Sequence, residues 1–122
     1  MANKADKKRV VVGVTGASGT PPAARCLRML REIGGIETHL VASAAAFTTA
    51  SYEIDAPFEE IASLADVCHD DGALDAPIAS GTFRTAGMIV VPCSMKTVAG
   101  IASGYSDSLL LRAADVTVKE GR

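Results

Sequence analysis

The chain has 122 residues, 48% hydrophobic and 21% charged, which suits one domain with its own core and excludes a disordered or fibrous protein. Twelve basic and fourteen acidic residues give a net charge of −2, which argues against nucleic acid or an anionic membrane as the main partner. No apolar run is long enough to span a membrane, and three cysteines without paired spacing indicate neither a disulfide framework nor a zinc site, so we expect a cytoplasmic protein.

Strand-like and helix-like segments alternate along the chain. A β-branched run at residues 9–15 predicts a buried strand that leads into a glycine-rich turn. Thr20 and the two prolines after it predict a capped helix start, and two glycines at 34–35 predict its end. The same rules predict a strand at 36–42, a helix capped by Ser43 and running to about residue 54, and a short helix at 58–64. They then predict a buried strand at 87–91, a helix at 95–102, and a last helix that is capped by Ser106 or Asp107 and ends at Lys119.

This alternation predicts an α/β fold in which a parallel sheet lies between helices. We expect residues 1–8 to form a flexible N-terminal segment and residues 9–122 to form one domain. The stretch before the 87–91 strand is polar, and we interpret Cys68–Asp71 within it as a polar loop. These residue types also bind metals, but contiguous residues do not easily converge on one ion.

Three glycines, Gly13, Gly16 and Gly19, lie where the first strand becomes a helix. The free N–H groups and the positive helix end at such a turn favour phosphate. The spacing matches neither a P-loop nor the GxGxxG dinucleotide motif. Ser18 adds a hydroxyl suited to a phosphate or to the edge of a flavin. A turn that serves only close strand–helix packing is an equally weighted alternative.

The segment PCSMKT, residues 92–97, follows the 87–91 strand in the equivalent position. Ligands of open α/β sheets bind beyond the carboxyl ends of the strands, so we expect both turns to face one crevice. Ser94 and Thr97 supply hydroxyls for a polar ring or a phosphate. Cys93 fits a small buried thiol better than a nucleophile, because neither histidine lies in a recognisable triad pattern.

Charged residues suggest two further sites. Arg112 and Lys119 lie seven residues apart, on one face of the last helix, where two cations would clamp a phosphate monoester. Asp115 lies between them at helical spacing, so spacing alone favours a surface ladder of salt bridges. Glu53, near the end of the second predicted helix, would act as an acid or a base if it faces the crevice, although most such carboxylates are solvated.

Four motifs, GVTGASG, HLVAS, APIASGTFRTAGMIVVPCSMKT and LLLRAADVTVKE, occur in an order that resembles the UbiX-like flavin prenyltransferases, in particular the members that form part of hydroxyaryl acid decarboxylases. The resemblance runs from about Arg9 to Lys119. It implies a three-layer, flavodoxin- or Rossmann-like fold that binds reduced FMN. It also implies a homo-oligomeric enzyme that transfers a dimethylallyl group from dimethylallyl monophosphate to the flavin without a metal. The product, prenylated FMN, would serve a UbiD-type aromatic acid decarboxylase.

The resemblance also implies roles for single residues. The positions that match FMN-binding residues are Gly16, Ala17, Ser18, Ser43, Ser94, Met95, Lys96 and Thr97. Glu53 and Ser18 take the catalytic positions, and Arg112 and Lys119 take the positions that hold the substrate phosphate.

Family members continue beyond the position of Arg122, with a further strand and further phosphate-holding residues, so we expect a C-terminally truncated domain. Without that strand we expect one edge of the 87–91 strand to be exposed, the chain to self-associate, FMN binding to be weak and prenyl transfer to be negligible. A non-catalytic FMN-binding or assembly subunit is therefore an alternative. A flavin-dependent cysteine decarboxylase of related fold is another, although residues 20–34 lack the histidine typical of that group.

Overall fold

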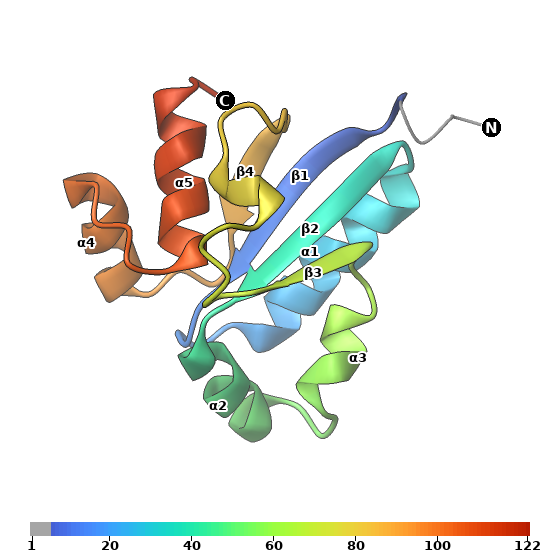
Figure 1. The fold of residues 1–122 in the computed structure, drawn as a ribbon. Coiled ribbons are helices and arrows are strands. Elements are labelled where there is room, and N and C mark those ends of the chain that lie inside the picture. The colour runs from blue at the N-terminus through green and yellow to red at the C-terminus, as the bar shows by residue number, and fades with distance from the viewer. Residues whose placement is uncertain (1–5) are drawn as a thin grey trace.

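A computed structural model describes residues 6–122 as a parallel sheet with helices on both faces (Figure 1). The elements in chain order are β1 (Lys8–Val14), α1 (Thr20–Ile33), β2 (Ile36–Ala42), α2 (Ala44–Glu53), α3 (Phe58–Ala62), β3 (Val67–Asp70), the 3-10 helix η2 (Pro77–Ala79), β4 (Gly87–Val90), α4 (Met95–Ser103) and α5 (Leu109–Lys119). The predicted α/β class and parallel sheet are confirmed. Of the segment predicted to be flexible, residues 1–5 lie outside the described residues, and β1 already begins at Lys8.

The strands of the sheet have the order β3-β2-β1-β4, and every neighbouring pair is parallel. β1 is central and pairs with β2 along its whole length, from Lys8 opposite Ile36 to Val14 opposite Ala42. Within the described residues β4 pairs with β1 alone, so β4 forms one edge of the sheet and β3 the other. Because the strands are parallel, the turns that follow β1, β2 and β4 all lie at the carboxyl ends of the strands, on one side of the molecule.

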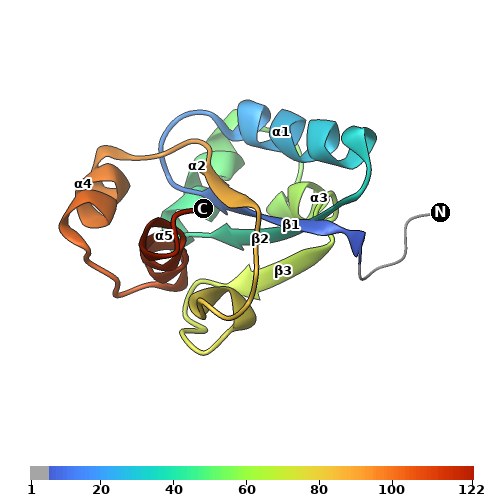
Figure 2. The same cartoon turned by 90° about the horizontal axis from the view of Figure 1, so that it is seen from above.

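Three layers are visible when the molecule is seen from above (Figure 2). Side chains of each strand alternate between the two faces of the sheet. Val12 of β1 packs in the core that includes Leu27 of α1, together with α2 and α3. Val11 packs in the opposite core with Leu110 of α5 and with η2. All four side chains are almost completely buried, so the sheet has a hydrophobic core on each face.

Three local predictions are wrong. Residues 68–70 are not a loop but belong to β3, which pairs with β2 at the edge of the sheet. A four-residue edge strand with alternating half-buried and exposed side chains offers too short a pattern to distinguish it from a polar loop. The N-cap of α1 is Gly19 rather than Thr20, and α5 is capped by Ser108, whose hydroxyl accepts the N–H of Leu111.

The strand predicted at 87–91 is present as β4, but it is only half-buried, because it lies at the edge of the sheet. Ile89 keeps 39% of its surface exposed. The expected exposed edge is therefore present within the described residues. No helix in residues 6–122 combines the length and the apolar character needed to cross a membrane.

Candidate functional site

A crevice of about 560 Å³ opens beside the turns at the carboxyl ends of β1, β2 and β4. This volume is typical of small-molecule sites, which range over about 300–1,000 Å³. The crevice is lined by Gly16, Ala17, Ser43, Ala44, Ala45, Asp71, Ser94, Lys96 and Thr97. Six of these residues were predicted to bind a ligand (Gly16, Ala17, Ser43, Ser94, Lys96 and Thr97), and the structure brings them together from three separate turns.

Gly16 lies in close contact with the start of α2. A Cβ atom added at Gly16 would lie 2.5 Å from the Cβ of Ala45, so a larger residue does not fit without movement. The hydroxyl of Thr49 in α2 donates a hydrogen bond to the carbonyl of Gly16. Gly16 is thus required for close packing of the turn against α2, and it also lines the crevice.

Glu53, at the end of α2, binds the other half of the same turn. Its Oε1 accepts the backbone N–H groups of Gly19 and Thr20, each at 2.9 Å, and its Oε2 accepts the hydroxyl of Ser18. The Ser18 hydroxyl above all, and then the two N–H groups, lower the pKa of Glu53 from its ordinary value of 4.5 to about 2. Since Gly19 has no side chain to cap α1, Glu53 supplies that cap from a different helix.

The two predicted catalytic residues, Glu53 and Ser18, therefore contact each other, but neither lines the crevice. A carboxylate with a pKa of about 2 is ionised at neutral pH. Glu53 consequently holds a negative charge and accepts hydrogen bonds, and it has no proton to donate as a general acid.

Ser43 occupies the N-cap position of α2, but its hydroxyl does not cap the helix. Its Oγ atom is buried and has no hydrogen-bond partner within the described residues. An unsatisfied buried hydroxyl costs about 1–3 kcal/mol, so this atom is suited to a polar group of a ligand in the crevice. The residues present therefore fit the flavin that the resemblance implies.

The turn after β4 presents the N-terminus of α4 to the crevice. The Ser94 hydroxyl accepts the N–H of Thr97 at 3.2 Å and lies 2.9 Å from the Thr97 hydroxyl. The free N–H groups and the positive end of the helix favour an anion, and Lys96 adds a cation. The side chain of Met95, in contrast, is 79% exposed and does not line the crevice.

Asp71 is a crevice residue that the sequence reasoning missed. Its carboxylate accepts the N–H of Leu110 at 2.9 Å, and its carbonyl accepts the N–H of Leu109 at 2.8 Å, so it holds the start of α5. Burial raises the pKa of Asp71, whereas the bond from Leu110 acts in the opposite direction. An acidic residue directly after a parallel strand would indicate a crevice residue. This signal cannot be recognised while residues 68–71 are interpreted as a loop.

Arg112 and Lys119 belong to the exposed face of α5 and do not line the crevice. Within residues 6–122 neither side chain forms an ion pair with Asp115, and Lys119 instead lies 3.7 Å from Glu120. The salt-bridge ladder that spacing favoured is therefore wrong for this part of the chain.

Cys93 is partly buried, and its Sγ lies 3.7 Å from the carbonyl oxygen of Ser94. Burial raises the pKa of the Cys93 thiol. A thiol with a raised pKa forms little thiolate at neutral pH, which makes it a poor nucleophile. This agrees with the interpretation of Cys93 as a thiol rather than a nucleophile, although Cys93 is partly buried and not fully buried as predicted.

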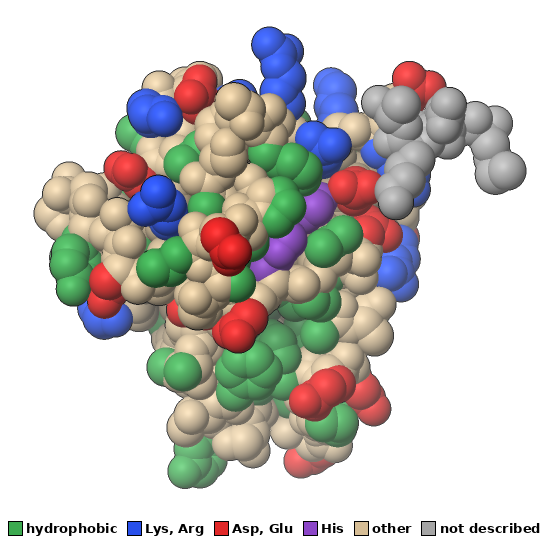
Figure 3. Space-filling view, in the orientation of Figure 1, with side chains coloured by type: hydrophobic (Ala, Val, Ile, Leu, Met, Phe, Trp, Pro, Cys, Tyr) green, Lys and Arg blue, Asp and Glu red, His purple; other side chains and the backbone are tan. Residues whose placement is uncertain are grey.

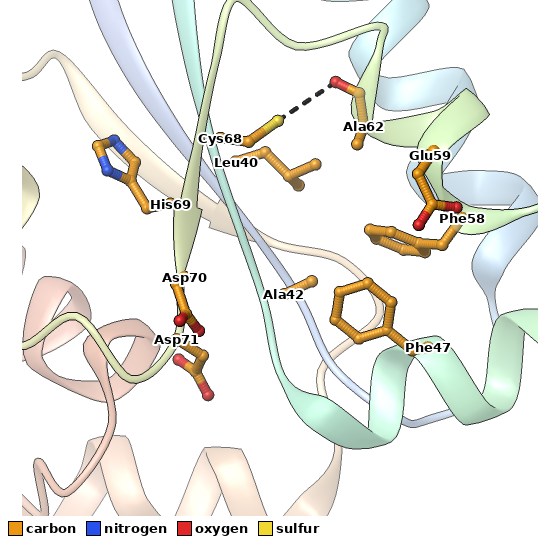
Figure 4. A pocket seen from close by; sticks show the side chains of 10 residues that line it. All are labelled: Leu40, Ala42, Phe47, Phe58, Glu59, Ala62, Cys68, His69, Asp70 and Asp71. Carbon is orange, nitrogen blue, oxygen red and sulfur yellow. Dashed lines mark hydrogen bonds between the residues drawn. The ribbon is translucent and has the colours of Figure 1, made fainter.

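A smaller cavity of about 130 Å³ lies between β3 and the aromatic pair Phe47 and Phe58, whose ring centroids are 4.5 Å apart (Figure 4). This volume is well below the range of about 300–1,000 Å³ for ligand sites. Among residues 6–122, no three His, Cys, Asp or Glu side chains are grouped so that they would hold a metal ion. The crevice at the strand ends is the candidate site, because it has the volume of a ligand site and is lined by the hydroxyls, the lysine and the helix N-termini described above.

The fold and the crevice define an α/β protein whose ligand site lies at the carboxyl ends of parallel strands. A family model described as Flavoprotein matches residues 1–122, and the chain belongs to this family. It is 51% identical over 115 residues to the flavin prenyltransferase UbiX of Escherichia coli (strain K12), a match that covers 94% of this chain and 61% of that enzyme. The resemblance to UbiX-like flavin prenyltransferases is thus confirmed.

Two solved structures are similar in fold as well as in sequence. A dodecameric FMN-dependent UbiX-like decarboxylase from Escherichia coli O157:H7 has a TM-score of 0.91 at 52% identity, covering 93% of this chain and 62% of that one. AnUbiX, crystallised with FMN and dimethylallyl pyrophosphate, has a TM-score of 0.92 at 47% identity, covering 95% of this chain and 61% of that one. The chain thus spans less than two thirds of the length of these relatives.

Proposed function

We propose that this chain carries the flavin-binding part of a flavin prenyltransferase, which transfers a dimethylallyl group from dimethylallyl monophosphate to reduced FMN. The observation that carries the proposal is the buried Ser43 hydroxyl, which has no hydrogen-bond partner among residues 6–122 and lies at a crevice formed by the N-termini of α2 and α4. Two facts support it: about half of the aligned residues are identical to those of UbiX, and a similar structure was crystallised with FMN and dimethylallyl pyrophosphate.

Different crevice residues would contact different parts of FMN. Ser43, Ser94 and Thr97 provide hydroxyls, while Lys96 and the helix N-termini favour the negative charge of the flavin phosphate. Gly16 and Ala17 let the ligand approach the backbone of the first turn. Met95 contributes its backbone N–H at the start of α4 rather than its exposed side chain. When bound, reduced FMN supplies the nucleophilic ring atoms that accept the dimethylallyl group.

The remaining residues serve the transfer step. The Ser18 hydroxyl donates a hydrogen bond to the ionised Glu53, so the lone pairs of Ser18 Oγ are left to accept a hydrogen bond from the ligand. Arg112 and Lys119 hold the substrate phosphate, which leaves as the bond between it and the dimethylallyl carbon breaks. The product, prenylated FMN, serves a UbiD-type decarboxylase. We place the protein in the cytoplasm, as a homo-oligomer like its dodecameric relative.

Binding of FMN is tested by titration, followed through the quenching of flavin fluorescence. Replacing Ser43 with Ala should weaken FMN binding roughly five-fold, because one hydrogen bond to the ligand is lost. The same change should leave the melting temperature of the ligand-free chain unaltered or raised, since it removes an unsatisfied buried hydroxyl.

The matched control is Ser51→Ala. Ser51 lies in the same helix, and its hydroxyl donates a hydrogen bond to the carbonyl of Thr48, away from the crevice. This variant should bind FMN like the unmodified chain. The assignment of the crevice fails if the unmodified chain does not bind FMN, or if the Ser43 and Ser51 variants have equal affinity.

A second candidate function is that of a non-catalytic FMN-binding subunit. The observation that favours it is the position of Arg112 and Lys119 outside the crevice, so that Lys96 is the one basic side chain that lines it among the described residues. Incubation with reduced FMN and dimethylallyl monophosphate separates the two functions. A mass gain in the extracted flavin demonstrates transfer, whereas bound flavin of unchanged mass supports the non-catalytic role.

A further inference from the structure

We propose that Thr15 is a positioning residue that fixes the two ligand-facing turns, residues 16–19 and 94–97, relative to each other through one hydroxyl group. The inference rests on the proposed function, because the turns concerned form the crevice assigned to FMN. Thr15 does not line the crevice itself, so it acts through the residues that do.

The hydroxyl of Thr15 connects the ends of β1 and β4. Thr15 directly follows β1 and is 2% exposed. Its Oγ1 donates to the carbonyl of Pro92 at 2.7 Å and accepts the N–H of Ser94 at 2.9 Å. Its backbone N–H also donates to the carbonyl of Pro92, at 3.2 Å. One side chain, itself buried, thus makes two hydrogen bonds to a segment almost eighty residues away.

These bonds control crevice geometry on both sides of Thr15. Ser94 is the N-cap of α4 and orders Thr97 through its own hydroxyl, so the bond from its N–H to Thr15 sets where α4 begins. On the other side, Thr15 precedes Gly16, whose carbonyl is held by Thr49 of α2. The Thr15 hydroxyl therefore links the start of α4 to the turn that α2 already holds.

Thr38 provides a matched control at the other end of the sheet. It is also 2% exposed, and its hydroxyl also bridges two segments, since it lies 3.3 Å from Asp66 Oδ2 and accepts the N–H of Asp66 at 3.0 Å. Asp66 directly precedes β3, so this bridge lies near the amino ends of the strands, away from the crevice. A purely structural role would make the two threonines equivalent.

The experiment compares the unmodified chain with Thr15→Val, Thr15→Ser and Thr38→Val, measuring the melting temperature and the dissociation constant for FMN. Valine keeps the shape of threonine but leaves the N–H of Ser94 without its acceptor. Both valine variants should melt at a lower temperature. Thr15→Val should raise the dissociation constant for FMN roughly five- to ten-fold, whereas Thr38→Val should leave it unchanged. Thr15→Ser, which keeps the hydroxyl, should bind FMN like the unmodified chain.

The inference is overturned if Thr15→Val and Thr38→Val change FMN affinity by the same factor, or if Thr15→Ser fails to restore it. If Thr15→Val does not fold, Thr15→Cys replaces it, because a thiol of similar size is a much weaker hydrogen-bonding group. If the unmodified chain does not bind FMN, the proposed function fails and the inference falls with it. If the chain binds FMN and Thr15→Val binds it equally well, the inference alone fails.

Discussion

Glu53 shows how one carboxylate can hold a turn in place. α1 begins with Thr20 and two prolines, and its N-cap is a glycine without a side chain, so its first N–H groups need an acceptor from elsewhere. The carboxylate of Glu53 accepts two of them and the Ser18 hydroxyl as well. A negative charge at this point is also favoured by the positive end of the helix.

Replacing Glu53 with Gln should lower the melting temperature at neutral pH. The folded-state pKa of about 2 lies below the ordinary value of 4.5, so the carboxylate stabilises the folded chain above pH 4.5 and loses this effect as the pH falls toward 2. The difference in melting temperature between the two proteins should therefore shrink over that interval. Thermal unfolding followed by circular dichroism at pH 7, 4 and 2 measures it. A difference that stays constant with pH would contradict this role of the charge.

Gly16→Ala is expected to damage folding and ligand binding together. The added methyl would overlap Ala45, and Ala45 lies in the first turn of α2, so the turn and the helix must move apart. Overpacking of this kind costs about 1–3 kcal/mol. Urea unfolding and FMN titration of the variant measure both effects. Gly72→Ala is the control, since a Cβ there meets only Asp70 oxygens at 3.8–4.0 Å, and it should be close to neutral.

At the level of elements, β2 and β3 are joined by a pair of histidines. His39 Nδ1 lies 2.9 Å from His69 Nε2, and His39 Nε2 lies 2.7 Å from the carboxylate of Glu37. Arg9 of β1 lies 3.7 Å from the same carboxylate and 4.0 Å from the ring of Phe83. The histidine side chains are partly covered by their neighbours in the space-filling view (Figure 3). The contact between His39 Nδ1 and His69 Nε2 needs one proton, carried by one ring and accepted by the other, so these two facing nitrogens cannot both be protonated.

This histidine pair should make the chain less stable in mild acid. Burial, and then the neighbouring His39, lower the pKa of His69 below its ordinary value of 6.5. Neutral His69 therefore stabilises the fold above pH 6.5, and this contribution is lost as the pH falls below it. In His69→Asn the decline in stability between pH 7 and 5 should be smaller. Denaturant unfolding across that range tests the expectation, and equal slopes in the two proteins would refute it.

The elements that could be predicted from the sequence have a long apolar pattern or are bounded by glycine or proline. The apolar run of β1 and the glycines after α1 define their elements locally, and the rule for strand ends then predicts that the turns after β1 and β4 face one crevice. The set of six crevice residues, Ser43 among them, came from the family resemblance instead. β3 was not predictable, because it has four residues and gains its stability from pairing with β2. The cap that Glu53 provides was also hidden, since it depends on residues more than thirty positions apart brought together by the fold.

For the whole molecule, the main feature outside the crevice is the apolar surface beside β4. A groove of about 580 Å³ runs between α1 and β4. Its exposed apolar side chains include Met29, Ile33 and Ile89. β4 pairs on one side alone within the described residues, so its backbone N–H and C=O groups are open to another strand along the same surface. An edge strand with apolar side chains is a common site of pairing between chains.

The 122-residue chain should therefore self-associate at micromolar concentration, and Ile89→Lys should shift it toward the monomer. A lysine on an edge strand places a charge where a second copy of β4 would approach, and both copies would carry it. Val98→Lys is the control, because Val98 is similarly exposed, at 44% against 39%, but lies on α4, away from this groove. Sedimentation velocity over a range of concentrations distinguishes the three proteins. The prediction is wrong if the unmodified chain is monomeric throughout, or if the two lysine variants dissociate to the same extent; the second result would show that added charge, rather than the β4 edge, controls the association.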